Sequence, residues 1–202
     1  MTDFSILTVC TGNICRPPLA EQWLRADTAR WPGISVASAG TGALVDHPMT
    51  DQAQVLAREF GANDSDSHVA RALTVDQLRG ADLVIALSRE HHRSVVALLP
   101  PGARHTFTLR ELARLLTNVR DEDLSMIAAL DTTDVAGRLS ALVDVAASRR
   151  GVVKPPESPE DDDVIDSPRQ HDNIYRQSAD KLAPAVTTVL SQFARALTVV
   201  RP

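Results

Sequence analysis

Two cysteines and an arginine near the start of the chain are the residues whose chemistry is easiest to interpret. Residues 9–18 read VCTGNICRPP, so Cys10 and Cys15 lie five positions apart and Arg16 follows directly; the 202-residue sequence has no further cysteine. A cysteine is a good nucleophile as its thiolate, and a nearby guanidinium favours that form. The segment therefore indicates nucleophilic chemistry at Cys10 on an anionic substrate.

The spacing between Cys10 and Arg16 suits a loop that curls around a tetrahedral anion such as phosphate or sulfate. Backbone N–H groups can contact the oxygens of the anion while the guanidinium contacts two of them in fork geometry. Gly12 permits close backbone approach, and Asn13 tolerates left-handed backbone angles. The predicted phosphate-binding residues are Thr11, Gly12, Asn13, Ile14, Cys15 and Arg16.

The flanking sequence places this loop between a strand and a helix. FSILTV (4–9) is a short apolar and β-branched run, and PPLAEQWLRADTAR (17–30) has apolar residues on one helical face. In open α/β sheets, ligands bind at the carboxyl ends of strands, and helix N-termini favour anions. The same setting lowers the pKa of a thiol.

Further along the chain, strands and helices are predicted to alternate. Strands are expected at 34–42, 82–88 and 105–109, and helices at about 50–60, 89–98 and 110–116. Thr74 and Gln77 have capping-box spacing, and a long amphipathic helix over 172–197, with a bend at Pro184, closes the chain. This order predicts an α/β fold with a mostly parallel, four-stranded sheet.

The length predicts one domain over residues 1–202. Between about 117 and 163 the pattern loosens, with one helix expected at 134–148 and then a stretch rich in proline and charge. We interpret this segment as an insertion or a flexible lid.

Composition and charge argue against several partners. The net charge is -5, which disfavours nucleic acid. The chain has no apolar run of about 18 residues, which disfavours a membrane span, and no secretion-signal pattern at its start. Two closely spaced cysteines do not suggest a structural disulfide framework, so we expect a cytoplasmic protein. His91 and His92 lack metal-ligand spacing and are expected to be exposed, and we expect no metal and no nucleotide cofactor.

The motif VCTGNICR closely resembles the active-site loop V-C-x-G-N-x-C-R-S-P of the low-molecular-weight protein tyrosine phosphatases. SAGT (38–41), HPM (47–49), ARALT (70–74) and ADLVIALSREH (81–91) resemble stretches of bacterial members in the same order. The resemblance implies the three-layer α/β/α fold of phosphotyrosine protein phosphatase I.

The resemblance also implies roles for individual residues. Cys10 is the nucleophile that forms a cysteinyl-phosphate, and Arg16 stabilises the phosphoryl group. Asp166, nine residues before Tyr175, is the general acid and then the base for hydrolysis. Cys15 either forms a disulfide with an oxidised Cys10 or only packs in the loop. The implied substrates are phosphotyrosine proteins, among them bacterial tyrosine kinases, or small phosphomonoesters, and no cofactor is needed.

Three features depart from the family pattern. Pro17 replaces a serine whose hydroxyl hydrogen-bonds the thiolate, Asp-Ser-Pro at 166–168 replaces Asp-Pro, and Arg169, Gln170 and His171 stand where aromatic residues are common. Two alternatives therefore stay open: a weak or inactive relative that binds phosphate, and an arsenate reductase that uses Cys15 or an external thiol. Asp166 also follows an acidic run at 160–163, so it could be one more solvated carboxylate.

Overall fold

A parallel sheet of four strands forms the centre of the molecule. The computed structural model describes residues 3–62, 64–164 and 172–201, apart from the side chains of residues 17 and 172–178. The strands follow the order β2-β1-β3-β4, and every neighbouring pair is parallel. Their bounds are β1 Phe4–Cys10, β2 Ile34–Gly40, β3 Leu83–Ala86 and β4 Thr106–Thr108. The predicted fold class is confirmed.

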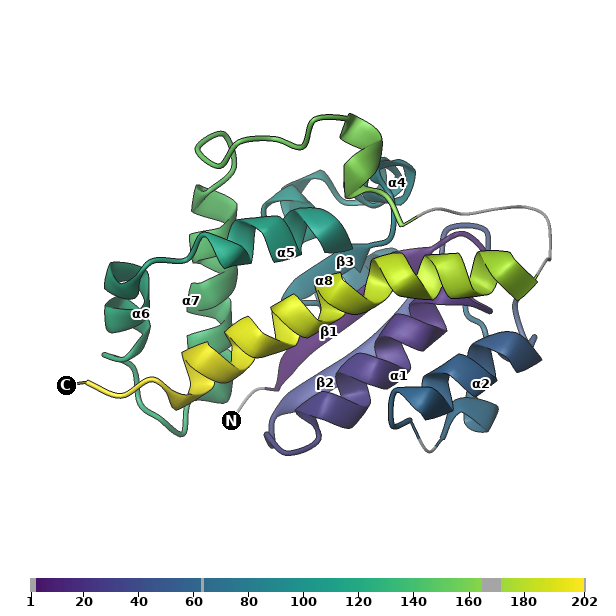
Figure 1. The fold of residues 1–202 in the computed structure, drawn as a ribbon, viewed down its shortest axis with the longest axis horizontal. Helices are drawn as coiled ribbons and strands as arrows, with labels where there is room; N and C mark the ends of the chain where they lie inside the picture. The colour runs from purple at the N-terminus through teal and green to yellow at the C-terminus, as the bar shows by residue number, and fades with distance from the viewer. Residues whose placement is uncertain (1–2, 63, 165–171, 202) are drawn as a thin grey trace.

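Helices connect and surround these strands (Figure 1). They are α1 Arg16–Thr28, α2 Asp51–Glu59, α3 Val75–Arg79, α4 Arg89–Leu98, α5 Leu109–Thr117, α6 Asp121–Ile127, α7 Val135–Ser148 and α8 Asp172–Thr198. The predicted helix at 89–98 is confirmed to the residue, as is the capping box of Thr74 and Gln77 at the start of α3. In the described part of the chain, no helix has the length and apolar character needed to cross a membrane.

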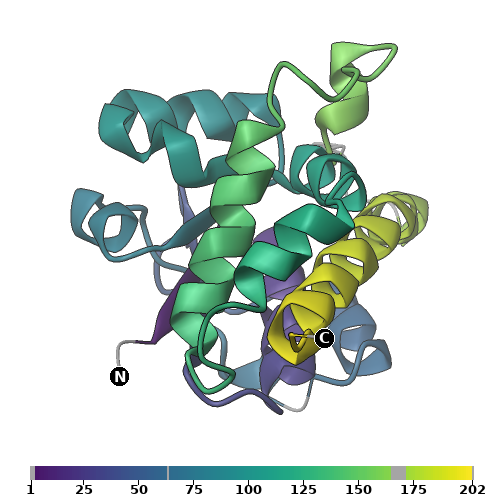
Figure 2. The same ribbon diagram turned by 90° about the vertical axis from the view of Figure 1, so that its left-hand side faces the viewer.

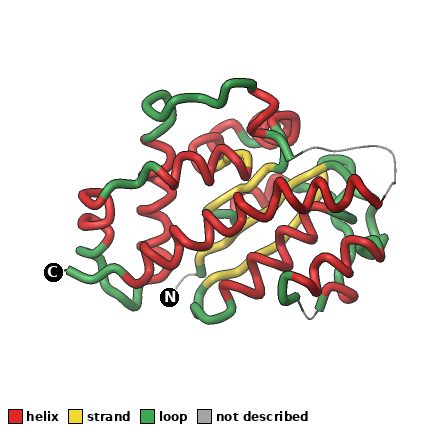
Figure 3. The backbone as a smooth tube through the Cα atoms, viewed as in Figure 1, coloured by secondary structure: helices red, strands yellow, loops and turns green. Residues whose placement is uncertain are grey.

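The two faces of the sheet are covered by different helices. Phe4 and Ile6 of β1 point to one face, where they join a large apolar cluster with α1, α5, α7 and α8. Leu7 and Val9 point to the other face and pack with residues of α3 and α4. Successive side chains of a strand alternate between faces, so β1 is buried on both. Figure 3 shows the strands lying behind the red helices of the first face.

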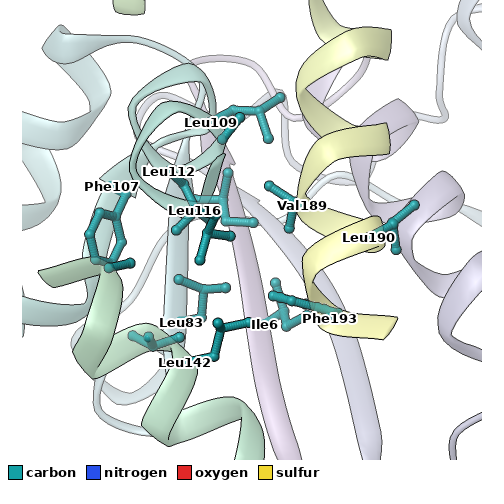
Figure 4. Close-up of a cluster of buried hydrophobic side chains, with 14 of the residues drawn as sticks. Ile6, Leu83, Phe107, Leu109, Leu112, Leu116, Leu142, Val189, Leu190 and Phe193 are labelled. Carbon is teal, nitrogen blue, oxygen red and sulfur yellow. The ribbon is translucent and has the colours of Figure 1, made fainter. Parts of the chain in front are cut away.

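The larger core is mainly aliphatic. Figure 4 shows the leucines of α5 on one side and Val189 of α8 on the other, with Ile6 and Leu83 of the sheet below them, near Leu142 and Phe193. Phe4 meets Phe193 edge to face, with 6.4 Å between ring centroids. Few aromatic residues are needed, because closely packed leucine, valine and isoleucine fill the space between sheet and helices.

The segment 117–163 is more ordered than its sequence pattern predicts. It contains α6, which the sequence analysis missed, as well as the expected helix, α7. Leu139 and Leu142 of α7 are fully buried in the large cluster, and Figure 2 shows α7 beside α6 and the C-terminal part of α8. These helices form part of the core, so the idea of a flexible lid is wrong for them. That the segment is an insertion relative to the family stays a prediction.

A buried arginine ties α7 to the end of α8. Arg138 is fully buried, and its Nη1 donates to the carbonyls of Ala196 and Leu197 at 3.0 and 2.9 Å, while Nη2 donates to that of Val199 at 2.8 Å. The last carbonyls of a helix have no hydrogen-bond partner within the helix. A cation near them also interacts favourably with the negative end of the helix dipole. Arg138 therefore caps α8 from inside the protein.

The topology fixes where a ligand would bind. From β1 the chain passes through α1 to β2 on one side, whereas β3 pairs with β1 on the other side. The carboxyl end of β1 is thus a topological switch point, where crevices form in open α/β sheets. Cys10 is the last residue of β1.

Candidate active site

The loop of residues 10–16, here called the phosphate loop, is held by its carbonyl groups. The six carbonyls of residues 10–15 each accept a hydrogen bond from a donor outside the loop, at 2.8 to 3.1 Å. In the order of these carbonyls, the donors are the backbone N–H groups of Thr41, Gly42 and Leu44, His68 Nε2, and the backbone N–H groups of Thr50 and Leu19. The whole carbonyl side of the loop is therefore turned toward the surrounding protein.

This arrangement determines the direction of the N–H groups. In a planar trans peptide, the N–H of each residue points opposite to the carbonyl of the residue before it. The amides of residues 11–16 therefore face the opposite, inner side of the loop. The Asn13 N–H donates to Cys10 Sγ at 3.4 Å, which places the sulfur on that inner side. A row of inward amides around a sulfur is an anion-binding concavity.

Asn13 has the backbone conformation that the sequence predicts. Its φ is 57°, in the left-handed region that asparagine tolerates better than most residues. This angle reverses the chain within the phosphate loop.

Cys10 and Arg16 are the two ends of the phosphate loop. Cys10 is 4% exposed at the end of β1, and Arg16 is 5% exposed as the first residue of α1. Inward amides and the N-terminal end of a helix are features that favour the thiolate form of a cysteine. In the described structure Cys10 and Cys15 are both thiols and do not form a disulfide with each other.

A buried polar network supports Asn13 from behind. Its Nδ2 donates to Ser38 Oγ at 2.7 Å, and its Oδ1 accepts from the Arg71 N–H at 2.9 Å. The Ser38 hydroxyl donates to the carboxylate of Glu21, which is 1% exposed. His68 donates through Nε2 to the Asn13 carbonyl, which can only accept. The network fixes both the side chain and the backbone of Asn13.

The buried carboxylate of Glu21 is paired with two arginines and lies near a histidine. Arg25 forms an ion pair with one carboxylate oxygen, Arg71 Nη2 lies 4.0 Å from the same oxygen, and His68 Nδ1 lies 3.7 Å from the other. A buried carboxylate is tolerated only when paired and hydrogen-bonded. No role was predicted for Glu21 from the sequence, although a carboxylate between the apolar residues of a helix that covers a sheet is a signal of a buried, paired charge.

The glycine that the loop needs most is Gly40, not Gly12. A Cβ at Gly12 would lie 3.6 Å from Ile14 Cγ1, an ordinary contact, so the protein itself does not require the predicted close approach there. A Cβ at Gly40 would overlap the Thr11 carbonyl oxygen and lie 2.9 Å from Ala43 Cβ. Gly40 belongs to the segment SAGT, but no role was predicted for this glycine from the sequence.

The expected exposure of His91 is wrong. His91 is 4% exposed, with Nε2 2.9 Å from Thr11 Oγ1 of the phosphate loop and Nδ1 2.8 Å from Ser88 Oγ. Ser88 also caps α4, since its Oγ accepts from the His91 N–H at 3.3 Å. The first turn of α4 therefore supports the loop from the side of β3.

Residues 158–164, here called the acidic strap, reach Arg16 through Val164. Val164 is fully buried, its N–H donates to the Leu87 carbonyl at 2.8 Å, and its carbonyl accepts from Arg16 Nη1 at 2.9 Å. Before it, Asp163 and Glu160 both form ion pairs with Arg89, at 3.0 and 2.9 Å.

These contacts affect the protonation of the acidic strap. Hydrogen bonds that Arg89 donates to Asp163 and Glu160 raise its pKa. The pKa of Glu160 is lowered to about 2, first by the Ser158 hydroxyl, then by a backbone hydrogen bond and by Arg89. The carboxylates of the acidic run are thus held in place and are not merely solvated.

Three residues of the sequence analysis are not settled by this geometry. Asp166, the predicted general acid, lies outside the described residues. The side chains of Pro17 and Tyr175 are likewise outside the described part. The described chain resumes with α8 at Asp172.

Comparison with known proteins identifies the family. The model of the low molecular weight phosphotyrosine protein phosphatase family matches residues 5–127, more than half of the chain, including the phosphate loop. The chain belongs to this family.

Individual relatives agree with that assignment. The low molecular weight protein-tyrosine-phosphatase Etp of Escherichia coli K12 is 44% identical over 96 residues, which are 48% of this chain and 62% of Etp. The probable phosphatase AmsI of Erwinia amylovora is 40% identical over 96 residues, 48% of this chain and 64% of AmsI. The chain thus spans less than two thirds of the length of these curated relatives.

Solved structures extend the similarity of fold to most of the chain. The low molecular weight protein tyrosine phosphatase of T. tengcongensis superposes with a TM-score of 0.63 at 26% identity, covering 94% of this chain and 99% of that one. The predicted phosphotyrosine protein phosphatase I-like fold is confirmed.

Proposed function

We propose that this member of the low molecular weight phosphatase family hydrolyses phosphomonoesters, with phosphotyrosine in proteins as its substrate. The observation that carries the proposal is the set of six outward carbonyls, which turns the amides of the phosphate loop toward Cys10 Sγ. Backbone amides already aimed at an oxyanion stabilise it without reorganisation during the reaction.

The first step is transfer of the phosphoryl group to sulfur. The Cys10 thiolate attacks phosphorus, the S–P bond forms, and the bond from phosphorus to the ester oxygen breaks. Asp166 donates its proton to the leaving oxygen. Arg16 and the amides of residues 11–16 stabilise the charge on the other phosphoryl oxygens.

The second step restores the thiolate. Asp166, now ionised, removes a proton from a water molecule that attacks phosphorus, and the S–P bond breaks to release inorganic phosphate. The charge stabilisation comes from Arg16 and the loop amides, so the proposal includes no metal and no cofactor. A phosphate or sulfate ion should bind in the same loop.

Names of relatives support the choice of substrate. Etp is named a protein-tyrosine-phosphatase, whereas a relative from Geobacillus stearothermophilus, 32% identical over 108 residues, is named a protein-arginine-phosphatase. The higher identity favours phosphotyrosine, and a bacterial tyrosine kinase is the proposed protein partner. The pair of thiols suits a reducing compartment, so a cytoplasmic location is part of the proposal.

The direct test replaces the proposed nucleophile. Cys10→Ser should lower the hydrolysis of para-nitrophenyl phosphate on the order of a thousandfold or more, because a neutral hydroxyl replaces a thiolate. Binding of inorganic phosphate, measured by calorimetry, should persist because the loop amides are unchanged. Turnover by Cys10→Ser at the parent rate would refute the proposal.

The assay should also compare phosphotyrosine, phosphoserine and phosphoarginine, together with the variants Asp166→Asn and Pro17→Ser. Loss of the acid should slow esters with poor leaving groups more than para-nitrophenyl phosphate. Restoring the serine hydroxyl should raise the rate if the thiolate lacks that hydrogen bond.

The two alternatives predict different results from the same protein. A binding module would bind phosphate with turnover at background, and an arsenate reductase would produce arsenite in a thiol-dependent assay. The proposed phosphatase requires turnover that depends on Cys10.

A further inference from the structure

Arg16 is oriented by a contact from a distant part of the chain. Its Nη1 donates to the Val164 carbonyl at 2.9 Å, and both residues are at least nine-tenths buried. A guanidinium is planar, so fixing one nitrogen restricts the plane in which its other N–H groups lie. A phosphoryl group that accepts two parallel hydrogen bonds from Arg16 needs that plane in one orientation.

The position of the Val164 carbonyl depends in turn on the junction of β3 and α4. The Val164 N–H donates to the Leu87 carbonyl at 2.8 Å, one residue beyond β3. Asp163 Oδ1 accepts from the Arg89 N–H at 2.7 Å, and its two carboxylate oxygens accept from Arg89 Nε and Nη2 at 3.0 to 3.3 Å. Arg89 Nη2 also reaches Glu160. One arginine therefore binds the acidic strap at two points.

We propose that Arg89 is a positioning residue of the site, which acts through Asp163 to hold the Val164 carbonyl against Arg16 and so orients the guanidinium for the phosphoryl group. The inference rests on the proposed function, because it takes Arg16 as the residue that binds phosphate. It assigns a role in the site to a residue that contacts neither Cys10 nor the phosphate loop in the described structure.

The chain offers a matched control in the next ion pair of the same strap. Arg114 Nη2 of α5 binds Asp162 at 2.9 Å, and its side chain is 25% exposed compared with 30% for Arg89. Both pairs join an arginine to a carboxylate of the acidic strap at similar depth. Asp162 lies one residue farther from Val164, and Arg114 belongs to a helix that does not contribute to the β3–α4 junction.

The experiment measures the binding of inorganic phosphate by calorimetry in the full-length protein, with kcat and KM for para-nitrophenyl phosphate beside it. Arg89→Ala and Asp163→Asn should each raise the Kd for phosphate about threefold to tenfold, the range of partly exposed charge pairs that act on a neighbour. Both changes weaken the same side-chain ion pair and leave the backbone N–H of residue 89 in place, so the phosphate Kd of the double variant should not exceed that of the more affected single variant. Arg89→Lys, which keeps the positive charge that Arg89→Ala removes, should recover part of the affinity.

Arg114→Ala should leave the Kd within about twofold of the parent value. A purely structural loss would reduce the folded fraction, seen by circular dichroism, without changing the Kd of the folded protein. Asp163→Asn changes one atom of a side chain and keeps the inference testable if Arg89→Ala does not fold.

Three results would overturn the inference: an unchanged Kd in Arg89→Ala, an equal rise in Arg114→Ala, or additive effects in the double variant. The proposed function fails separately. A parent protein that binds phosphate but shows no Cys10-dependent turnover is not a phosphatase, and its phosphate Kd still reports on Arg89. A parent protein that binds no phosphate overturns both.

Discussion

The phosphate loop and the acidic strap meet at the hydrogen bond from Arg16 to Val164, and they are held largely by different kinds of interaction. The phosphate loop is fixed by backbone hydrogen bonds and by the buried network of Asn13, Ser38 and Glu21. The acidic strap has a backbone hydrogen bond at Val164, and the rest of it is held mainly by ion pairs in which Arg89, Asp163 and Glu160 are 30, 22 and 70% exposed.

The difference has consequences for stability and for response to conditions. Buried hydrogen bonds are costly to leave unmade, and salt screens them little. Partly exposed ion pairs contribute little each and weaken as ionic strength rises. The part of the site that receives the anion should therefore be rigid, whereas the part that orients Arg16 should respond to salt and pH.

The largest expected effect comes from disrupting the buried network that holds the phosphate loop. Asn13→Ala removes the hydrogen bonds to Ser38 and from the Arg71 N–H, and leaves alanine at a φ of 57°. We expect the free energy of unfolding to fall by about 2–4 kcal/mol, from the lost buried hydrogen bonds and the left-handed backbone angle. Urea denaturation followed by circular dichroism measures this loss.

The matched control is Asn118→Ala at the end of α5. Asn118 donates through Nδ2 to the Arg114 carbonyl at 2.8 Å, but it is exposed and its φ is -96°. Its replacement should cost less than about 1 kcal/mol. Equal losses at both positions would show that the buried network is not what holds the phosphate loop.

A smaller effect is expected at the contact between β2 and the phosphate loop. Gly40→Ala places a methyl group against the Thr11 carbonyl oxygen, which can move only if the backbone of the loop moves. A Cβ at Gly42 would instead lie 3.5 Å from the Thr11 Cγ2 methyl group, which is an ordinary contact. Gly40→Ala should destabilise the fold by about 1–3 kcal/mol, as overpacking does, and weaken phosphate binding. Gly42→Ala should change neither by a measurable amount, and a matching loss there would contradict this explanation.

The same comparison explains what could be predicted from sequence. The strand, the loop with its left-handed Asn13 and the helix that follows are contiguous, so their residue types and spacing carry the information. The alternation of strands and helices is likewise a local pattern, and it predicted the parallel sheet. Caps such as Thr74 with Gln77 need only three residues of spacing.

The supports of the loop could not be predicted in this way. Asn13, Glu21, Ser38 and His68 come from four separate segments and meet only after the sheet and helices have packed. Helical periodicity shows that a residue such as His91 lies on a helix, but not that the first turn of α4 faces the phosphate loop. The burial of Arg138 in α7 could not be predicted either. Arginine is almost never fully buried unless it is paired, and the sequence does not show which groups pair with it.

Salt should change the amide exchange rates of the two regions differently, by a modest factor. The Val164 N–H belongs to the acidic strap, and the Gly42 N–H donates to the Thr11 carbonyl of the phosphate loop. Between 0.1 M and 1 M salt the screening length falls from about 10 to about 3 Å, so the amide of Val164 should exchange with solvent about two to five times faster. The amide of Gly42 should not change beyond the intrinsic effect of salt. Hydrogen exchange followed by NMR measures both rates. If the two amides accelerated by the same factor, the phosphate loop and the acidic strap would not differ in their response to salt.

The smallest effect is a change in protonation at the outer edge of the acidic strap. The pKa of Glu160 lies at about 2, below its usual 4.5, and the Ser158 hydroxyl is a larger cause than Arg89. Because this pKa is depressed in the folded protein, the contact stabilises the fold at pH values above 4.5, and the contribution is lost as the pH falls from 4.5 toward 2. Arg89→Ala should raise the pKa of Glu160 without restoring its usual value, and Ser158→Ala should raise it further. NMR titration of the Glu160 carboxyl carbon measures both shifts. If Arg89→Ala left this pKa unchanged, the ion pair that joins Glu160 to the start of α4 would not form in solution, and the strap would be held through Asp163 alone.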